Sequence, residues 1–170
     1  MAVLPILAFS DKRLHVAAAE VTGFGPELAV LADDLLETMR AAPGIGITAP
    51  HVGVGLRVVV IELPGEEARC YVNPAIDWAS AEKIRQMEGS VSMPGVAEPV
   101  ERHARVRVRY ADLTGALQIE EAAGLLAVCL QHEIDQLDGI FWTRRLSPLR
   151  RDRLAKRYGK LVAGQGGKPR

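Results

Sequence analysis

The chain has 170 residues, of which 48% are apolar and 25% charged, so it has the length and composition of one soluble domain with its own core. Two cysteines are too few for a secreted disulfide framework, and no apolar run is long enough to cross a membrane. The apolar stretch from Met1 to Phe9 lacks the basic start of a signal peptide. We therefore expect a cytoplasmic protein.

The net charge is zero, but the charges are unevenly distributed along the chain. From Arg144 to Arg170 there are ten Lys or Arg residues and one acid, Asp152, which leaves eleven basic and twenty acidic residues before Arg144. The sequence is an acidic body with a basic C-terminal region. We expect neither a membrane nor DNA as a partner.

The first predicted elements are one helix and two strands. Apolar residues recur at helical spacing between Pro26 and Met39, and proline suits a first helical turn, so this segment predicts an amphipathic helix. After a glycine-rich loop, the β-branched run at 56–63 predicts a buried strand. A shorter strand at 70–74 should end at its proline.

A strand pair is predicted next. Residues 105–110 alternate strictly between arginine and apolar residues, so Val106, Val108 and Tyr110 should face the core. Residues 117–120 should pair with this strand after a turn at Gly115.

Two helices follow in the last third of the chain. Residues 124–138 are apolar over much of a helical circumference, which favours a central helix that Gly139 ends as a C-terminal cap. Ser147 and Pro148 suit the N-cap and first position of a final helix that runs to about Lys160. We expect an α+β domain over residues 1–163 and a disordered tail over 164–170.

Residues 132–136, His-Glu-Ile-Asp-Gln, match the zinc-hydrolase motif H-E-x-x-H except that glutamine replaces the last histidine. In the intact motif, two histidines one helical turn apart hold the metal, and the glutamate acts as a base on the metal-bound water. The sequence therefore indicates an altered metal site.

Three segments in this order resemble the signature motifs of the bacterial peptide deformylases. They are GIGITAPHVG at 44–53, EGSVSMP at 88–94 and QHEIDQLDG at 131–139, beside the family patterns G-x-G-x-A-A-x-Q, E-G-C-L-S and H-E-x-x-H. The resemblance implies a peptide-deformylase-like fold, in which short, mostly antiparallel sheets surround a central helix, with helices at both chain ends. It also implies the family reaction, hydrolytic removal of the formyl group from the N-terminal methionine of nascent polypeptides.

The resemblance places the three ligands of the family's iron or zinc ion at Ser90, His132 and Gln136. A serine hydroxyl keeps its proton where a cysteine binds as thiolate, and an amide oxygen suits hard cations better than iron or zinc. We therefore expect no bound metal cofactor and a lost or severely impaired deformylation.

The other family roles are carried over in the same way. The catalytic glutamate corresponds to Glu133, the oxyanion-binding glutamine to His51, and the backbone N–H that assists it to Val91. The residues expected to bind the substrate backbone and the methionine side chain are Gly44, Ile45, Gly46, Gln86, Leu125 and Val128. Because Gln86 replaces an apolar residue of the family, methionine recognition should be weakened.

The retained polar residues allow several interpretations. Ser90, His132 and Gln136 can hydrogen-bond to one another or to a trapped water, which is the structural interpretation that we favour. His51 can instead join His132 in a rebuilt metal site completed by Glu133 or a water. A triad of Ser90, His132 and Glu133 is disfavoured because adjacent helical side chains diverge by about 100°.

Three functions thus stay open. The first is a deformylase-like protein without hydrolytic activity. The second is a non-catalytic module that binds N-formylmethionyl peptides or, through the basic C-terminal helix, the ribosome. The third is an active metal hydrolase that uses His51 and His132.

Overall fold

The computed structural model describes residues 1–166 and has the α+β architecture that the sequence predicts. Its three α-helices are α1 (Pro26–Ala41), α2 (Gly124–Leu137) and α3 (Pro148–Gln165). Its strands are β1 (Gly46–Thr48), β2 (Val58–Ile61), β3 (Arg69–Ala79), β4 (Lys83–Ser90), β5 (Met93–His103), β6 (Arg105–Ala111) and β7 (Leu117–Ala123). Short 3-10 helices are η1 (Lys12–His15), η2 (Ala49–Val52) and η3 (Trp142–Arg145).

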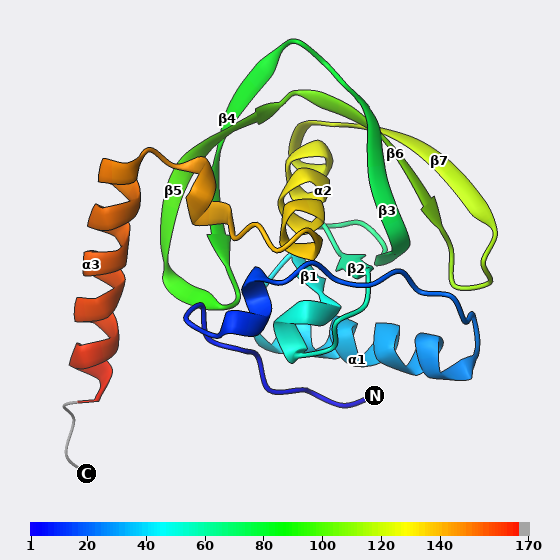
Figure 1. Cartoon of the computed structure of the whole chain (residues 1–170), viewed down its shortest axis with the longest axis horizontal. Coiled ribbons are helices and arrows are strands. Elements are labelled where there is room, and N and C mark those ends of the chain that lie inside the picture. Colours follow the sequence, from blue (N-terminus) through cyan, green and yellow to red (C-terminus); the bar gives the residue numbers. More distant parts are fainter. Residues whose placement is uncertain (167–170) are drawn as a thin grey trace.

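Helix α2 lies at the centre, between a five-stranded antiparallel sheet of order β1-β2-β3-β6-β7 and a separate β4–β5 hairpin (Figure 1). Helix α1 packs on β1 and β2, and α3 lies at the flank against β5. Most of α2 is buried, including Leu130 and Leu137, which are fully buried in the core beside β2, β3 and β6. The prediction of a central apolar helix is confirmed, and Gly139 follows it with φ 75°, as a helix-ending glycine requires.

The paired strands 105–111 and 117–123 confirm the predicted alternation. Val106 and Val108 are fully buried, whereas Tyr110 is half-buried and packs on the Tyr71 ring with a centroid distance of 4.6 Å. The arginines between them point away from the core.

The prediction that the strand from Cys70 ends at Pro74 is wrong. Strand β3 continues to Ala79 because it leaves the regular ladder with β6 between Val72 and Ala75. Asn73 takes φ 51° in this irregularity. Pro74 therefore lies where β3 and β6 are out of register, and its missing N–H removes no regular hydrogen bond between the two strands.

The C-terminal helix begins as predicted, with the Ser147 side chain accepting a hydrogen bond from the N–H of Arg150. It continues to Gln165, beyond both its predicted end near Lys160 and the predicted domain boundary at residue 163. Leu154 anchors the helix in an apolar cluster with Met93 and Trp142. Helix α3 thus includes the first two residues of the expected tail, and residues 167–170 lie outside the described residues.

The β4–β5 hairpin has no counterpart in the sequence predictions. Its strands pair from Lys83–His103 to Ser90–Met93 and place Glu88 and Arg102 on the face toward α2. The hairpin closes the side of α2 that the five-stranded sheet leaves open.

Candidate active site

A cavity of about 430 Å³ opens between the loop before β1, the turn of the β4–β5 hairpin and the exposed side of α2. Ten of the residues that the sequence assigned to a site line this cavity: Gly44, Ile45, Gly46, His51, Ser90, Val91, Leu125, Val128, His132 and Glu133. The three sequence motifs therefore meet in one place, as the resemblance implied.

Two assigned residues do not line the cavity. Met87 lines it and Gln86 does not, because consecutive side chains of a strand lie on opposite faces, so the expected role of Gln86 gains no support from this cavity. Gln136 is also absent from the lining, since it is buried beneath the N-terminal segment.

The two glycines of the first motif are needed for close approach. A Cβ atom on Gly46 would lie 2.5 Å from Glu133 Oε1, and one on Gly44 would lie 2.8 Å from the Val91 side chain. The loop can lie against both residues only because these positions carry no side chain.

Glu133 is 5% exposed, and within the described part of the chain its Oε2 atom has no hydrogen-bond partner. Burial raises the pKa of this carboxyl to about 7. Glu133, a lining residue of the cavity, therefore carries a buried oxygen that no described residue uses.

His132 is held from behind by Glu88, with 2.6 Å between Nδ1 and Glu88 Oε1. Burial alone would lower the pKa of His132, but this hydrogen bond and the charges of Glu133 and Glu88 outweigh it and raise the pKa. Because a carboxylate only accepts hydrogen bonds, Nδ1 carries the hydrogen and Nε2 is the ring nitrogen left for the cavity.

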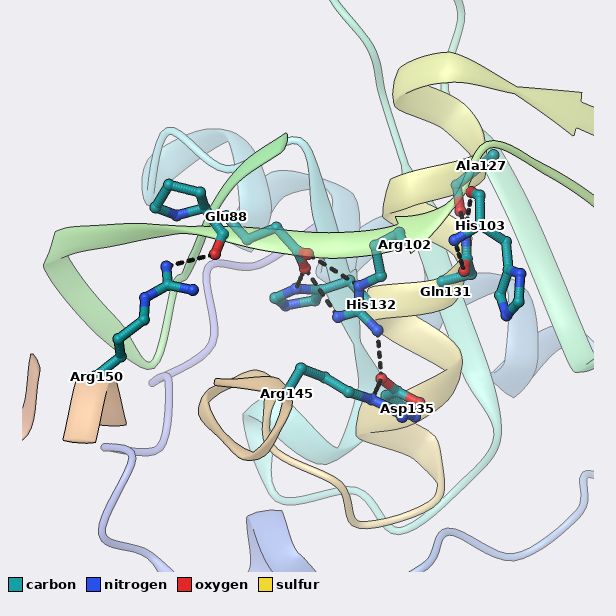
Figure 2. A network of polar contacts seen from close by, with 10 residues as sticks. Glu88, Arg102, His103, Ala127, Gln131, His132, Asp135, Arg145 and Arg150 are labelled. Carbon is teal, nitrogen blue, oxygen red and sulfur yellow. Dashed lines mark hydrogen bonds and ion pairs between the residues drawn. The ribbon is translucent and has the colours of Figure 1, made fainter. Parts of the chain in front are cut away.

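Behind this pair lies a buried ionic network centred on Arg102 (Figure 2). Its guanidinium donates from Nε and from one terminal nitrogen to the Glu88 carboxylate, both at 2.9 Å, and from the other terminal nitrogen to Asp135 at 2.5 Å. Arg145 completes the network with two bonds to Asp135, at 2.8 and 2.6 Å. Sequence reasoning missed the roles of Glu88 and Arg102, since they pair across a hairpin that it did not predict.

His51 is 1% exposed and is fixed by Thr48. The Thr48 N–H donates to His51 Nδ1 over 3.0 Å, and burial, assisted by the nearby His132 charge, lowers the pKa of His51 to about 3. The ring is therefore neutral near pH 7 with its hydrogen on Nε2. Among the described residues this N–H has no acceptor, so it is a buried donor beside the cavity.

The predicted hydrogen bonds among Ser90, His132 and Gln136 do not form directly. Gln136 Nε2 donates to the Leu14 carbonyl at 2.7 Å, and Ser90 Oγ accepts from the Ser92 N–H at 3.1 Å. Each of the three side chains thus hydrogen-bonds to a different partner: Ser90 to the Ser92 N–H, His132 to Glu88 and Gln136 to the Leu14 carbonyl.

These residues do not fit an iron or zinc ion. Ser90 offers a neutral hydroxyl, Gln136 offers an amide that is tied to Leu14, and His132 alone is a ligand that such ions prefer. Within residues 1–166, no three His, Cys, Asp or Glu side chains are grouped as metal ligands, and His51 uses Nδ1 for Thr48. A rebuilt metal site with His51 and His132 stays a prediction, since both rings keep Nε2 without a hydrogen-bond partner among the described residues.

The cavity can instead bind polar groups by hydrogen bonding. Its lining residues include His51, with a buried donor at Nε2, Glu133, with a buried acceptor at Oε2, and Ser90, with a hydroxyl, beside the apolar Ile45, Leu125 and Val128. This combination suits an amide or acyl group joined to an apolar side chain.

Comparison with known proteins gives the following similarities. The family model of polypeptide deformylase matches residues 3–152. A peptide deformylase-like protein of Brucella melitensis is 64% identical over 162 residues, covering 95% of this chain and 99% of the relative. A peptide deformylase of a Bradyrhizobium species is 42% identical over 174 residues, covering 98% and 99%. The crystal structure of a peptide deformylase from Legionella pneumophila is similar with a TM-score of 0.92 and 36% identity, covering 99% of this chain and 100% of that one.

Proposed function

Because the chain belongs to the peptide deformylase family, we propose that it keeps the family's peptide cavity but has lost metal-dependent deformylation. The loss is inferred from the residues at two of the family's metal-ligand positions. Ser90 offers a hydroxyl, and Gln136 offers an amide that is already hydrogen-bonded to the Leu14 carbonyl. Loss of an outer-shell partner alone typically costs about 10- to 100-fold in metal affinity or activity, so two changed ligands cost more.

Retained peptide binding is supported by the cavity itself. Its apolar walls suit a methionine side chain, the His51 N–H can donate to the oxygen of a formyl group, and Glu133 Oε2 can accept from the adjacent amide N–H. Both groups are buried and lack partners among the described residues, so a ligand that satisfies them removes a desolvation cost of about 1–3 kcal/mol each. The ligand class is therefore a peptide with an N-formylmethionyl end.

The test is metal analysis and deformylation assays on the purified protein and on the double variant Ser90→Cys with Gln136→His. We expect the unaltered protein to carry little iron, nickel or zinc and to release formate from formyl-Met-Ala-Ser very slowly, and the double variant to gain both metal and activity. The matched control makes the same two exchanges at exposed positions, Ser10→Cys with Gln118→His. Stoichiometric metal and fast deformylation in the unaltered protein would contradict the proposal.

Peptide binding is measured separately by calorimetric titration with formyl-Met-Ala-Ser and with unformylated Met-Ala-Ser. We expect binding that depends on the formyl group and is weakened by His51→Phe, which removes the N–H but keeps an aromatic ring. Equal affinity for the two peptides would contradict the assigned role of His51.

A second proposed partner is the ribosome, bound through α3. Four basic residues of this helix form no ion pair with any described residue: Arg151, Arg153, Lys156 and Lys160. Such a basic helix suits a phosphate backbone, and its binding should weaken as salt rises. Co-sedimentation with ribosomes, compared with that of Arg153→Glu/Lys156→Glu, tests this proposal, and undiminished sedimentation of the variant would refute it.

A further inference from the structure

We propose that Ser90, His132 and Glu88 form a metal-free acyl-transfer centre in the cavity, with Ser90 as the nucleophile. This inference goes beyond peptide binding, because it assigns a covalent reaction to the same cavity. It follows from the position of Glu88, whose carboxylate hydrogen-bonds to the His132 ring and orients it. Glu133 cannot orient this ring, because side chains at adjacent helical positions diverge.

The first part of the centre is an oriented histidine. Glu88 Oε1 lies 2.6 Å from His132 Nδ1, and Glu88 itself is held by two Arg102 hydrogen bonds and is only 6% exposed. The carboxylate thus fixes the ring and the hydrogen on Nδ1, and in the neutral form of the ring Nε2 is free to accept a proton. A histidine oriented by a carboxylate is the arrangement that activates serine nucleophiles in hydrolases.

The second part is the serine. Ser90 lines the same cavity as His132, and its oxygen accepts from the Ser92 N–H, which leaves the hydroxyl hydrogen free to donate. Within residues 1–166 there is no Ser90–His132 hydrogen bond, so the contact requires rotation about the Ser90 Cα–Cβ bond. That rotation gives up one hydrogen bond of 3.1 Å, and nucleophile–base contacts are often long before substrate binds.

The third part is a donor for the developing oxyanion. Since Thr48 donates to His51 Nδ1, the His51 hydrogen is on Nε2, where it is buried beside the cavity and has no acceptor within residues 1–166. A fixed N–H of this kind costs no reorganisation when charge forms on a substrate oxygen.

The reaction on a short-chain carboxylic ester is balanced as follows. Ser90 Oγ bonds to the carbonyl carbon while His132 Nε2 takes the hydroxyl proton, and the oxyanion accepts from the His51 N–H. The carbon–oxygen bond to the leaving group then breaks, and His132 returns the proton to the departing alkoxide or phenoxide. Water repeats the sequence on the Ser90 ester and releases the acid.

The test uses p-nitrophenyl acetate with excess EDTA, and intact mass spectrometry followed by peptide mapping. We expect one acetyl group on Ser90, no effect of EDTA, and a fall in acylation rate of about 100-fold or more in Ser90→Ala and in His132→Gln. The matched control is Ser92→Ala, which removes a neighbouring buried hydroxyl that has no partner among the described residues and should acylate at the rate of the unaltered protein.

Glu88 is a positioning residue, so its test needs a measurement that a purely structural role leaves unchanged. Glu88→Gln should slow acylation while the Kd for formyl-Met-Ala-Ser stays the same, and Glu88→Asp should recover part of the rate. Absence of acetyl on Ser90, or equal rates in the unaltered protein and His132→Gln, would overturn the inference. Because acylation and peptide titration are separate measurements, this result leaves the proposed binding function to its own test.

Discussion

Replacing Gly46 by alanine tests the close approach between β1 and α2. The added Cβ would lie 2.5 Å from Glu133 Oε1, 3.1 Å from its Cδ and 3.3 Å from its Cγ, where real Cβ contacts stay above 3.0 Å. Glu133 is buried and lies on the rigid central helix, so its side chain must leave its present rotamer. Overpacking of this kind costs about 1–3 kcal/mol in the free energy of unfolding.

For a chain of this length, 1 kcal/mol shifts the melting temperature by roughly 2–4 °C, so Gly46→Ala should lower it by about 2 to 12 °C. The assay is thermal unfolding followed by circular dichroism. The matched control is Gly55→Ala, because a Cβ there meets no atom within 4 Å and should change stability by less than about 0.5 kcal/mol.

A double-mutant cycle with Glu133→Ala identifies the source of the strain. If the clash is with this side chain, Gly46→Ala should cost much less in the Glu133→Ala background, with a coupling of at least about 0.5 kcal/mol. Additive effects of the two substitutions, or a melting temperature for Gly46→Ala equal to that of the unaltered protein, would refute the reasoning.

Three further results are expected. Arg102→Met should lower the free energy of unfolding by about 3–5 kcal/mol, since the buried Glu88 and Asp135 each lose one charged partner and keep only His132 and Arg145, respectively. Arg107→Ala breaks an exposed pair and should cost below about 1 kcal/mol, and equal urea midpoints for both variants would contradict this. The pKa of Glu133 is about 7 in the folded state, and its ordinary value is 4.5. The protonated carboxyl therefore contributes on the order of 3 kcal/mol to the free energy of unfolding below pH 4.5, and this contribution is lost as the pH rises through 7. Urea midpoints of Glu133→Gln should therefore fall less between pH 5 and pH 8 than those of the unaltered protein. Burial raises the thiol pKa of both Cys70 and Cys129 to about 12, so iodoacetamide at pH 8 should label them only after unfolding; fast labelling of the folded protein would show that they are accessible thiolates.

The helices were predictable because their signals are local. The apolar spacing after Pro26, the apolar circumference of 124–138 and the Ser147–Pro148 start each lie within one helix, and the structure confirms all three. The β4–β5 hairpin was not predictable in this way, since its inward positions include Glu88 and Arg102. Charged residues there are buried only because they pair across strands, which a hydrophobic pattern does not show.

The motif residues of the site could be predicted from the sequence, but the residues that hold them in place could not. The H-E sequence at 132–133 identifies the two helical side chains from local spacing alone. The bond from Gln136 to the Leu14 carbonyl joins residues 122 positions apart, so no sequence window contains both partners. Thr48 lies close to His51, and its place three residues earlier is a capping-box spacing that could have indicated how the ring is fixed.

The docking of the N-terminal segment has a consequence for synthesis. Leu14 is fully buried and its carbonyl accepts a hydrogen bond from Gln136 Nε2, and the Ala18 N–H donates to the Leu137 carbonyl. Both partners lie on the central helix, which is made late in translation. At about 5–20 residues per second, the ribosome needs roughly 6 to 24 s to add the 122 residues between Leu14 and Gln136. The first part of the chain to emerge can therefore make these two hydrogen bonds only after the central helix has been synthesised.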